Sequence, residues 1–63
     1  MLTTKVAVSS DQWEYWADYY FYGDCVSQGY YMVQNGLALS YDCLPFSIGT
    51  TVLWTLYVDV ITG

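Results

Sequence analysis

Histidine and arginine are absent from this chain, and Lys5 is its only basic side chain against six aspartates and glutamates. The net charge of −5 excludes binding to a polyanion through basic contacts, because counterion release needs Lys and Arg on the binding face. Without histidine the chain lacks the most common general base, and without arginine it lacks the side chain that most often binds phosphate. We therefore expect no catalytic residues, no enzyme activity and no direct binding of nucleic acid.

Long apolar runs and a basic leader are also lacking. The longest uncharged stretches, 25–41 and 43–58, are interrupted by glycine, proline or amide side chains. Both fall short of the roughly 20 apolar residues that a membrane span needs. No basic segment followed by an apolar run is visible at the start, so we expect a cytoplasmic protein without membrane contact.

Only two cysteines are present, Cys25 and Cys43. A cytoplasmic chain keeps its thiols reduced. If Asn35-Gly36 is a two-residue hairpin turn, Cys43 faces Gln28, and Cys25 lies about three positions, or roughly 10 Å, farther along. We therefore expect no disulfide, unless a loop at Cys25 folds back. No metal site and no cofactor are expected either, because two cysteines without histidine do not make a zinc site.

Apolar and aromatic residues are abundant, at 56% and 21% of the chain. Disordered acidic segments are poor in aromatics, so this composition predicts a folded protein. The 63 residues make a single small domain, 1–63, with one thin core.

The first third of the chain predicts a strand followed by a helix. Alternation of valines with polar residues predicts a strand over 3–9. At about 100° per residue, segment 11–22 separates its tryptophans from its acids, which favours a helix. As a strand, the same segment would put Trp13, Tyr15 and Ala17 on one face, and its many Tyr and Trp residues prefer strands. We favour the helix because its two faces segregate more cleanly.

The remainder predicts three strands. Asn35-Gly36 accepts the positive φ angles of a type I′ turn, so it predicts a hairpin between strands at 29–34 and 37–43. Residues 44–49 are predicted to be a connection because their proline cannot donate to a ladder. A long final strand is predicted over 50–62.

The predicted fold is α+β: one helix packed on a small, mostly antiparallel four-stranded sheet, in the order β-α-β-β-β. One sheet face would be covered by the helix and the other would be open. The expected core joins the helix aromatics to apolar strand residues: Trp13, Trp16, Tyr20, Phe21, Val6, Val8, Met32, Leu39, Trp54, Leu56 and Val58.

Two surfaces are candidates for recognition. The first is a helical stripe of acids, Asp11, Glu14 and Asp18, spaced i, i+3 and i+7 with no cation on the helix to neutralise them. Tyrosines share or border this stripe, and interfaces favour Tyr because it brings contact area with a hydrogen-bonding tip. The predicted partner-binding residues are Asp11, Glu14, Tyr15, Asp18, Tyr19 and Tyr22. The alternative is a solvated face that keeps the protein soluble.

The second candidate surface is the open sheet face. Its expected residues are Tyr31, Val33, Asp42, Tyr57 and Asp59. Self-association would bury this face and enlarge a small core, and capture of another protein is the competing interpretation.

These features predict a non-enzymatic, acidic module that binds a basic surface of a partner protein and inhibits or modulates it. In one version the carboxylates imitate DNA phosphates and occupy the groove of a nucleic-acid-handling protein. Short acidic inhibitors made by phages and mobile elements have a similar size and charge, although no motif links this chain to them. The alternative function is a structural or assembly subunit that forms a homodimer or larger oligomer through its open sheet face.

Overall fold

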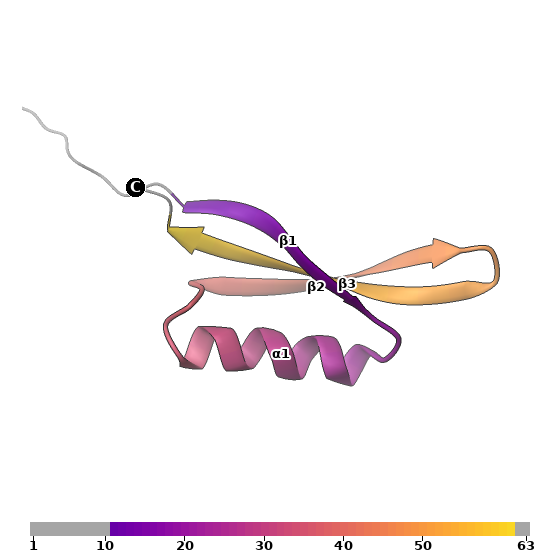
Figure 1. The fold of residues 1–63 in the computed structure, drawn as a ribbon, viewed down its shortest axis with the longest axis horizontal. Coiled ribbons are helices and arrows are strands. Elements are labelled where there is room, and N and C mark those ends of the chain that lie inside the picture. Colours follow the sequence, from indigo (N-terminus) through magenta and orange to yellow (C-terminus); the bar gives the residue numbers. More distant parts are fainter. Residues whose placement is uncertain (1–10, 62–63) are drawn as a thin grey trace, which may run out of the picture.

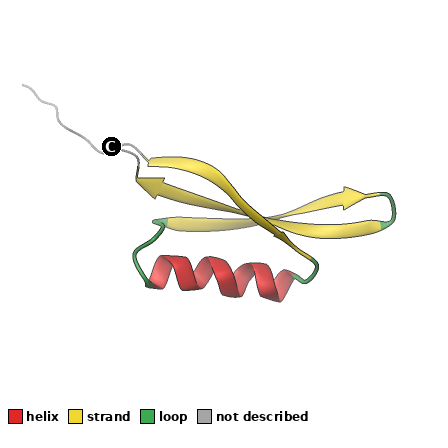
Figure 2. Cartoon of the chain, viewed as in Figure 1, coloured by secondary structure: helices red, strands yellow, loops and turns green. Residues whose placement is uncertain are grey.

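The computed structural model describes residues 11–61, which form a helix and an antiparallel sheet. In chain order the elements are strand β1 (Asp11–Tyr19), helix α1 (Tyr22–Gln34), strand β2 (Ser40–Ile48) and strand β3 (Thr51–Ile61). The helix lies along one face of the sheet (Figures 1 and 2). This two-layer arrangement confirms the predicted α+β class.

The sheet has the strand order β1-β3-β2, so the last strand lies in the middle and pairs antiparallel with both neighbours. Within residues 11–61 the sheet has three strands, whereas four were predicted for the whole chain. The strand predicted over 3–9 lies outside the described residues. The strand predicted over 29–34 is part of α1 instead.

The predicted helix over 11–22 is wrong, because residues 11–19 are extended in β1. The strand preference of Trp and Tyr, together with pairing to the long apolar β3, outweighs the helical periodicity. A strand also separates the acids. Glu14 lies on the opposite side of the sheet from Asp11 and Asp18, so the charges that a helix would line up are kept apart.

Helix α1 begins where the predicted helix was expected to end. Cys25, Gly29 and Met32 recur at helical spacing and form its buried side. Asp24 lies in the first turn, where a negative charge interacts favourably with the helix dipole.

The dipeptide Asn35-Gly36 ends α1 and does not form the predicted hairpin. Gly36 has φ of 72°, and its N–H donates to the Val33 carbonyl at 3.1 Å. The Leu37 N–H donates to the Met32 carbonyl at 2.8 Å, which completes a Schellman motif. A type I′ turn and this helix cap both need a positive φ at glycine, so the dipeptide alone does not distinguish them.

The hairpin of this fold joins β2 to β3 through Gly49-Thr50. Ile48 pairs with Thr51, and Gly49 has φ of 59° while Thr50 does not have a positive φ, as in a type II′ turn. Pro45 lies inside β2, so the predicted connection over 44–49 is mostly strand. Proline is tolerated there because β2 is an edge strand. The predicted final strand is confirmed over 51–61.

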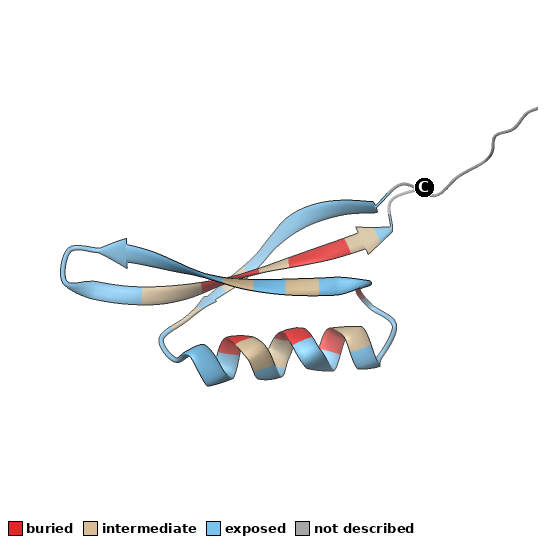
Figure 3. Cartoon of the chain, turned by 180° about the vertical axis from the view of Figure 1, so that it is seen from behind, coloured by how far each residue is buried: buried red, intermediate tan, exposed pale blue. Residues whose placement is uncertain are grey.

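The core is a single thin layer between α1 and β3 (Figure 3). Its buried residues are Cys25, Met32, Ala38, Leu56 and Val58. Met32, Leu56 and Val58 were predicted for the core, and Trp54 packs against it. The other described residues predicted to be buried are exposed: Trp13, Trp16, Tyr20, Phe21 and Leu39. The first two lie in the edge strand β1 and the other three in connections, whereas the prediction placed the first four on a helix packed against the sheet. Val6 and Val8 lie outside the described residues.

A disulfide joins Cys25 of α1 to Cys43 of β2, with Cα atoms 6.1 Å apart. The expectation of reduced cysteines is therefore wrong for this structure. It depended on a hairpin at Asn35-Gly36 that would have placed the cysteines about 10 Å out of register. With residues 22–34 helical, Cys25 instead lies over the inner side of β2, and the bond fastens the helix layer to the sheet.

Within residues 11–61, no helix combines the length and the apolar character that crossing a bilayer requires.

Candidate functional site

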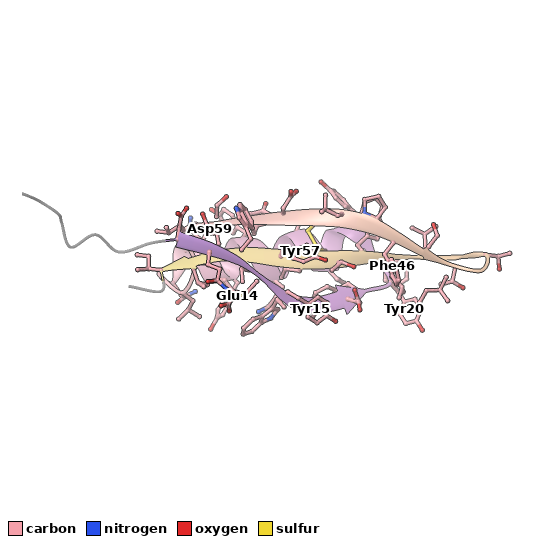
Figure 4. The ribbon with its side chains drawn as sticks, turned by 90° about the horizontal axis from the view of Figure 1, so that it is seen from above. Glu14, Tyr15, Tyr20, Phe46, Tyr57 and Asp59 are labelled. Atoms are coloured by element: carbon pink, nitrogen blue, oxygen red, sulfur yellow. A yellow bond between two sulfur atoms is a disulfide. The ribbon has the colours of Figure 1, made fainter. Side chains whose placement is uncertain are left out.

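No element among residues 11–61 covers the side of the sheet that faces away from α1, and the pairing register determines which side chains lie on it. Leu56 and Val58 of β3 face the helix, so the odd-numbered residues of β3 and their pairing partners project to the other side. We call this set the open face; Figure 4 looks onto it, with α1 behind. Its members are Asp11, Trp13, Tyr15 and Asp18 of β1, Thr51, Leu53, Thr55, Tyr57, Asp59 and Ile61 of β3, and Ser40, Asp42, Leu44, Phe46 and Ile48 of β2.

A β-bulge at Trp16 brings Asp18 onto the open face. The register between β1 and β3 shifts between Tyr15 and Ala17, so Asp18 pairs with Thr55. If residues 11–19 alternated strictly, with no bulge, Asp18 would lie on the helix side with Glu14.

Both carboxylate oxygens of Asp18 accept hydrogen bonds from side chains of the same sheet. The Tyr15 hydroxyl donates to Asp18 Oδ2 at 2.9 Å, and the Thr55 hydroxyl donates to Asp18 Oδ1 at 2.6 Å. The bond to Asp18 raises the pKa of Tyr15, since it stabilises the protonated phenol beside a negative charge. Asp18 therefore fixes two neighbours on the open face.

Tyr57 occupies the centre of the open face. It pairs with Tyr15 on one side and Asp42 on the other. The rings of Tyr15 and Tyr57 meet edge to face, with centroids 6.2 Å apart and planes at 75°. In Figure 4, Tyr57 lies between the two edge strands.

Two shallow hollows flank Tyr57. The larger, of about 320 Å³, is lined by Trp13, Asp42, Leu44 and Tyr57. The smaller, of about 210 Å³, is lined by Tyr15, Asp18, Phe46, Thr55 and Tyr57. Each combines aromatic rings with one carboxylate. Both are open to solvent, unlike the enclosed clefts that bury a small-molecule ligand.

Asp59 is the most unusual group of the open face. It is only 7% exposed, and no atom of residues 11–61 makes a hydrogen bond with its Oδ1. The register places it between Trp13 of β1 and Ser40 of β2. Burial raises the pKa of Asp59, and the nearby Asp11 carboxyl raises it further through a hydrogen bond and charge repulsion. A nine-tenths buried carboxylate without a full set of partners is costly unless something satisfies it.

The open face carries negative charge and no positive charge. Four carboxylates lie on it, and residues 11–61 contain no Lys or Arg. Their side chains alternate with exposed or half-exposed rings, Trp13, Tyr15, Tyr57 and Phe46. Carboxylates among aromatic rings suit recognition of cationic side chains, which gain both ion pairing and cation–π contact.

The residues predicted to form the acidic stripe do not lie together. Asp11, Tyr15 and Asp18 are on the open face, whereas Glu14 and Tyr19 point to the helix side, where Tyr19 packs against the core. Tyr22 is the first residue of α1, and its ring meets Trp54 edge to face at 4.8 Å. The helical stripe therefore has no physical basis as a single surface.

The residues predicted for the open sheet face are brought together in part. Asp42, Tyr57 and Asp59 do share that face. Tyr31 and Val33 lie on α1 instead, with Tyr31 exposed and Val33 packed against the core. Three residues of each predicted set thus meet on one surface.

Three residues of the hollows were not predicted as site residues: Trp13 and Leu44, which line the larger hollow, and Phe46, which lines the smaller. Trp13 was assigned to the core of a helix. Treating residues 11–17 as a strand would have identified Trp13, because strand alternation puts Trp13 and Tyr15 on one face. Leu44 and Phe46 lay in a predicted connection because Pro45 separates them.

Comparisons of the chain with protein-family models, with curated proteins and with solved structures find no match. Any assignment of function therefore depends on the geometry and chemistry of the open face.

Proposed function

We infer that the protein is a non-enzymatic binding module that uses its open face to engage a basic surface of a partner protein and thereby inhibits or modulates that partner. The observation that supports this most strongly is the gathering of four carboxylates and several rings on one uncovered face, with no cation among residues 11–61. Tyr and Trp are the residues that most often dominate binding energy at interfaces.

DNA mimicry is the sharper version of this proposal. In it, the carboxylates occupy the groove of a nucleic-acid-handling protein in place of phosphates. The net charge of −5 supports it, since a cationic groove would attract the protein from a distance. In this proposal the carboxylates that imitate phosphates are those of the open face, whereas the sequence had predicted those of a helical stripe.

Self-association through the open face is the weaker candidate. Stacking two copies face to face would bring two sets of four carboxylates together, and Lys5 is the only cation that each chain contributes. Like charges brought together in a desolvated interface cost several kcal/mol. A structural or assembly subunit that homo-oligomerises through the open face stays the alternative function, with the exposed apolar residues Phe46 and Ile48 as contact area. Light scattering after size exclusion distinguishes a monomer from a stable oligomer.

The cellular compartment is part of the proposal. The sequence predicts the cytoplasm, whereas a disulfide such as Cys25–Cys43 persists mainly in oxidising compartments. Alkylating free thiols in intact cells, followed by mass spectrometry, reports which redox state the protein has where it acts.

The proposed function is tested by capture of proteins from a host lysate at about 50 and 500 mM salt, since exposed charge pairs are screened over about 10 Å or less. The double variant Asp11→Asn/Asp42→Asn removes two exposed charges of the open face. We expect it to lower affinity for the captured partner about tenfold at low salt and to retain the fold. Glu14→Gln is the control for Asp42→Asn, because it removes one exposed charge from the other side of the same sheet. Equal loss in both single variants would refute a role for the open face.

A further inference from the structure

The larger hollow and the carboxylate of Asp59, whose Oδ1 has no hydrogen-bond partner among residues 11–61, lie next to each other on the open face. Trp13 lines the hollow and is also the direct pairing neighbour of Asp59. Tyr57 and Asp42, which also line it, are paired in the next row of the sheet, two residues along β3 from Asp59. Asp59 shares the odd parity of Tyr57, so its carboxylate projects to the same side as the hollow.

We propose that this hollow receives one arginine side chain of the basic partner, whose guanidinium bridges Asp42 and Asp59 and stacks against Trp13. This inference rests on the proposed function and names the chemical group that the partner must present at one point of the open face.

The spacing of the two carboxylates fits a planar guanidinium. Asp59 is a diagonal neighbour of Asp42 across β3 and β2, and such side chains start about 7 Å apart. Charge-assisted N–H···O bonds are about 2.8 Å long, so a guanidinium between the two carboxylates reaches both. Its fixed fork of donors also provides a partner for Asp59 Oδ1, which has none within the described part of the chain.

The aromatic walls select the same group. Trp13 is 49% exposed, so a large part of its ring is available to a ligand. Tryptophan is the best ring for a cation–π contact, and arginine stacks on it more readily than lysine. The second hollow is the poorer site, because both oxygens of its Asp18 already accept hydrogen bonds from Tyr15 and Thr55.

A second copy of this chain does not supply the occupant, since the sequence contains no arginine. The arginine must therefore come from a different protein, which agrees with charge complementarity between an acidic face and a basic partner.

The test is an NMR titration of the isotopically labelled protein with the peptide acetyl-Gly-Arg-Gly-amide at low salt. We expect saturable shifts of the Trp13 indole N–H and of the backbone amides of Asp42 and Asp59. A peptide with citrulline in place of arginine keeps the shape without the charge, and we expect it to cause no such shifts. A lysine peptide should bind several-fold more weakly.

Three variants make the result specific. Asp42→Asn and Trp13→Leu alter exposed side chains and should each weaken binding of the arginine peptide at least about threefold. Asp59→Asn should weaken it as well, and Glu14→Gln should leave it unchanged. Equal binding of the citrulline or lysine peptide, or undiminished binding to Asp42→Asn and Trp13→Leu, would overturn the inference.

Failure of this inference and failure of the proposed function give different results. If the peptide does not localise to the hollow while Asp11→Asn/Asp42→Asn still loses its captured partner, the arginine site is wrong and the binding face is retained. If the peptide binds in the hollow while capture is unaffected by that double variant, the arginine site is retained and the proposed function is wrong.

Discussion

At the scale of single residues, the two carboxylates of Asp18 and Asp59 share the open face but differ in how their oxygens are hydrogen-bonded. Asp18 accepts hydrogen bonds on both oxygens, from Tyr15 and Thr55, and so it stabilises the open face. Asp59 is nearly as inaccessible as a core residue, but its Oδ1 has no hydrogen-bond partner in the stretch from residue 11 to residue 61. A buried carboxyl with a raised pKa beside a hollow is a candidate for a functional group, and Asp59 meets that description.

The raised pKa of Asp59 gives a prediction for stability against pH. A folded-state pKa above the unfolded value of about 3.9 means that the folded protein binds the proton more tightly. The contribution of Asp59 to unfolding free energy is thus greatest below about pH 4 and falls as pH rises through the raised pKa. Denaturant melts of the parent and of Asp59→Asn across pH 3–8 measure it, since the difference between the two proteins isolates this residue.

The carboxylates that face Asp59 are Asp11 and Asp42 from the flanking edge strands, and Asp11 contributes to the raised pKa. Asp11→Asn should therefore flatten part of the same pH dependence. Parallel pH profiles for the parent and Asp59→Asn would show that the carboxyl is not perturbed.

At the scale of elements, the contact between α1 and β2 depends on a glycine. A Cβ built on Gly29 would lie 2.5 Å from Cγ and Cδ2 of Tyr41, closer than side chains tolerate. The helix reaches the sheet at this point only because residue 29 has no side chain. The same approach lets the Cys25–Cys43 bond form one turn away.

We predict that Gly29→Ala destabilises the protein by about 1–3 kcal/mol, because overpacking at Tyr41 exceeds the gain of about 1 kcal/mol in helix propensity. Gly23→Ala is the matched control. Its Cβ would have nothing within 4 Å, so that variant should be neutral or slightly more stable. Thermal or urea unfolding measures both, and equal effects at the two glycines would contradict the close approach.

Elements were predictable from the sequence where one signal dominates and not where two compete. The last strand follows from a wholly apolar even-numbered face beside a mixed odd-numbered face, and residues 51–61 confirm it. Segment 11–19 carries both a helical period and strand-preferring aromatics, and only the pairing with β3 decides between them. Asn35-Gly36 is compatible with either a hairpin turn or a helix cap; the hairpin was predicted, and the structure has the helix cap.

The candidate site was predictable only in part for the same reason. Asp42, Tyr57 and Asp59 follow from simple alternation in the two strands that were recognised. Asp18 lies on the open face because of the bulge at Trp16, and no local pattern in residues 11–19 predicted a bulge. Trp13 required the strand assignment that the sequence analysis rejected.

At the scale of the whole molecule, the fold has too little core to be held by packing alone. Within the described residues, five buried hydrophobic side chains form one layer, and a domain of this size buries only about 60% of its unfolded surface. The Cys25–Cys43 bond spans the two layers and constrains the unfolded chain. The covalent link is therefore expected to be a main source of stability.

Reduction of that bond should lower the unfolding free energy by about 3 kcal/mol, the value expected for a loop of this length. Urea melts with and without a thiol reductant measure the change, with far-ultraviolet circular dichroism reporting α1. A midpoint unaffected by reduction would mean that packing holds the helix on the sheet without the bond.

The central claim is that the open face, and not the helix side, contacts the partner. The three tryptophan indole N–H signals report this directly by NMR, because Trp13 lies on the open face and Trp54 lies on the helix side beside Tyr22. On addition of the captured basic protein, we predict that the Trp13 signal shifts or broadens strongly while the Trp54 signal stays in place. A shift of Trp54 with Trp13 unchanged would contradict the account.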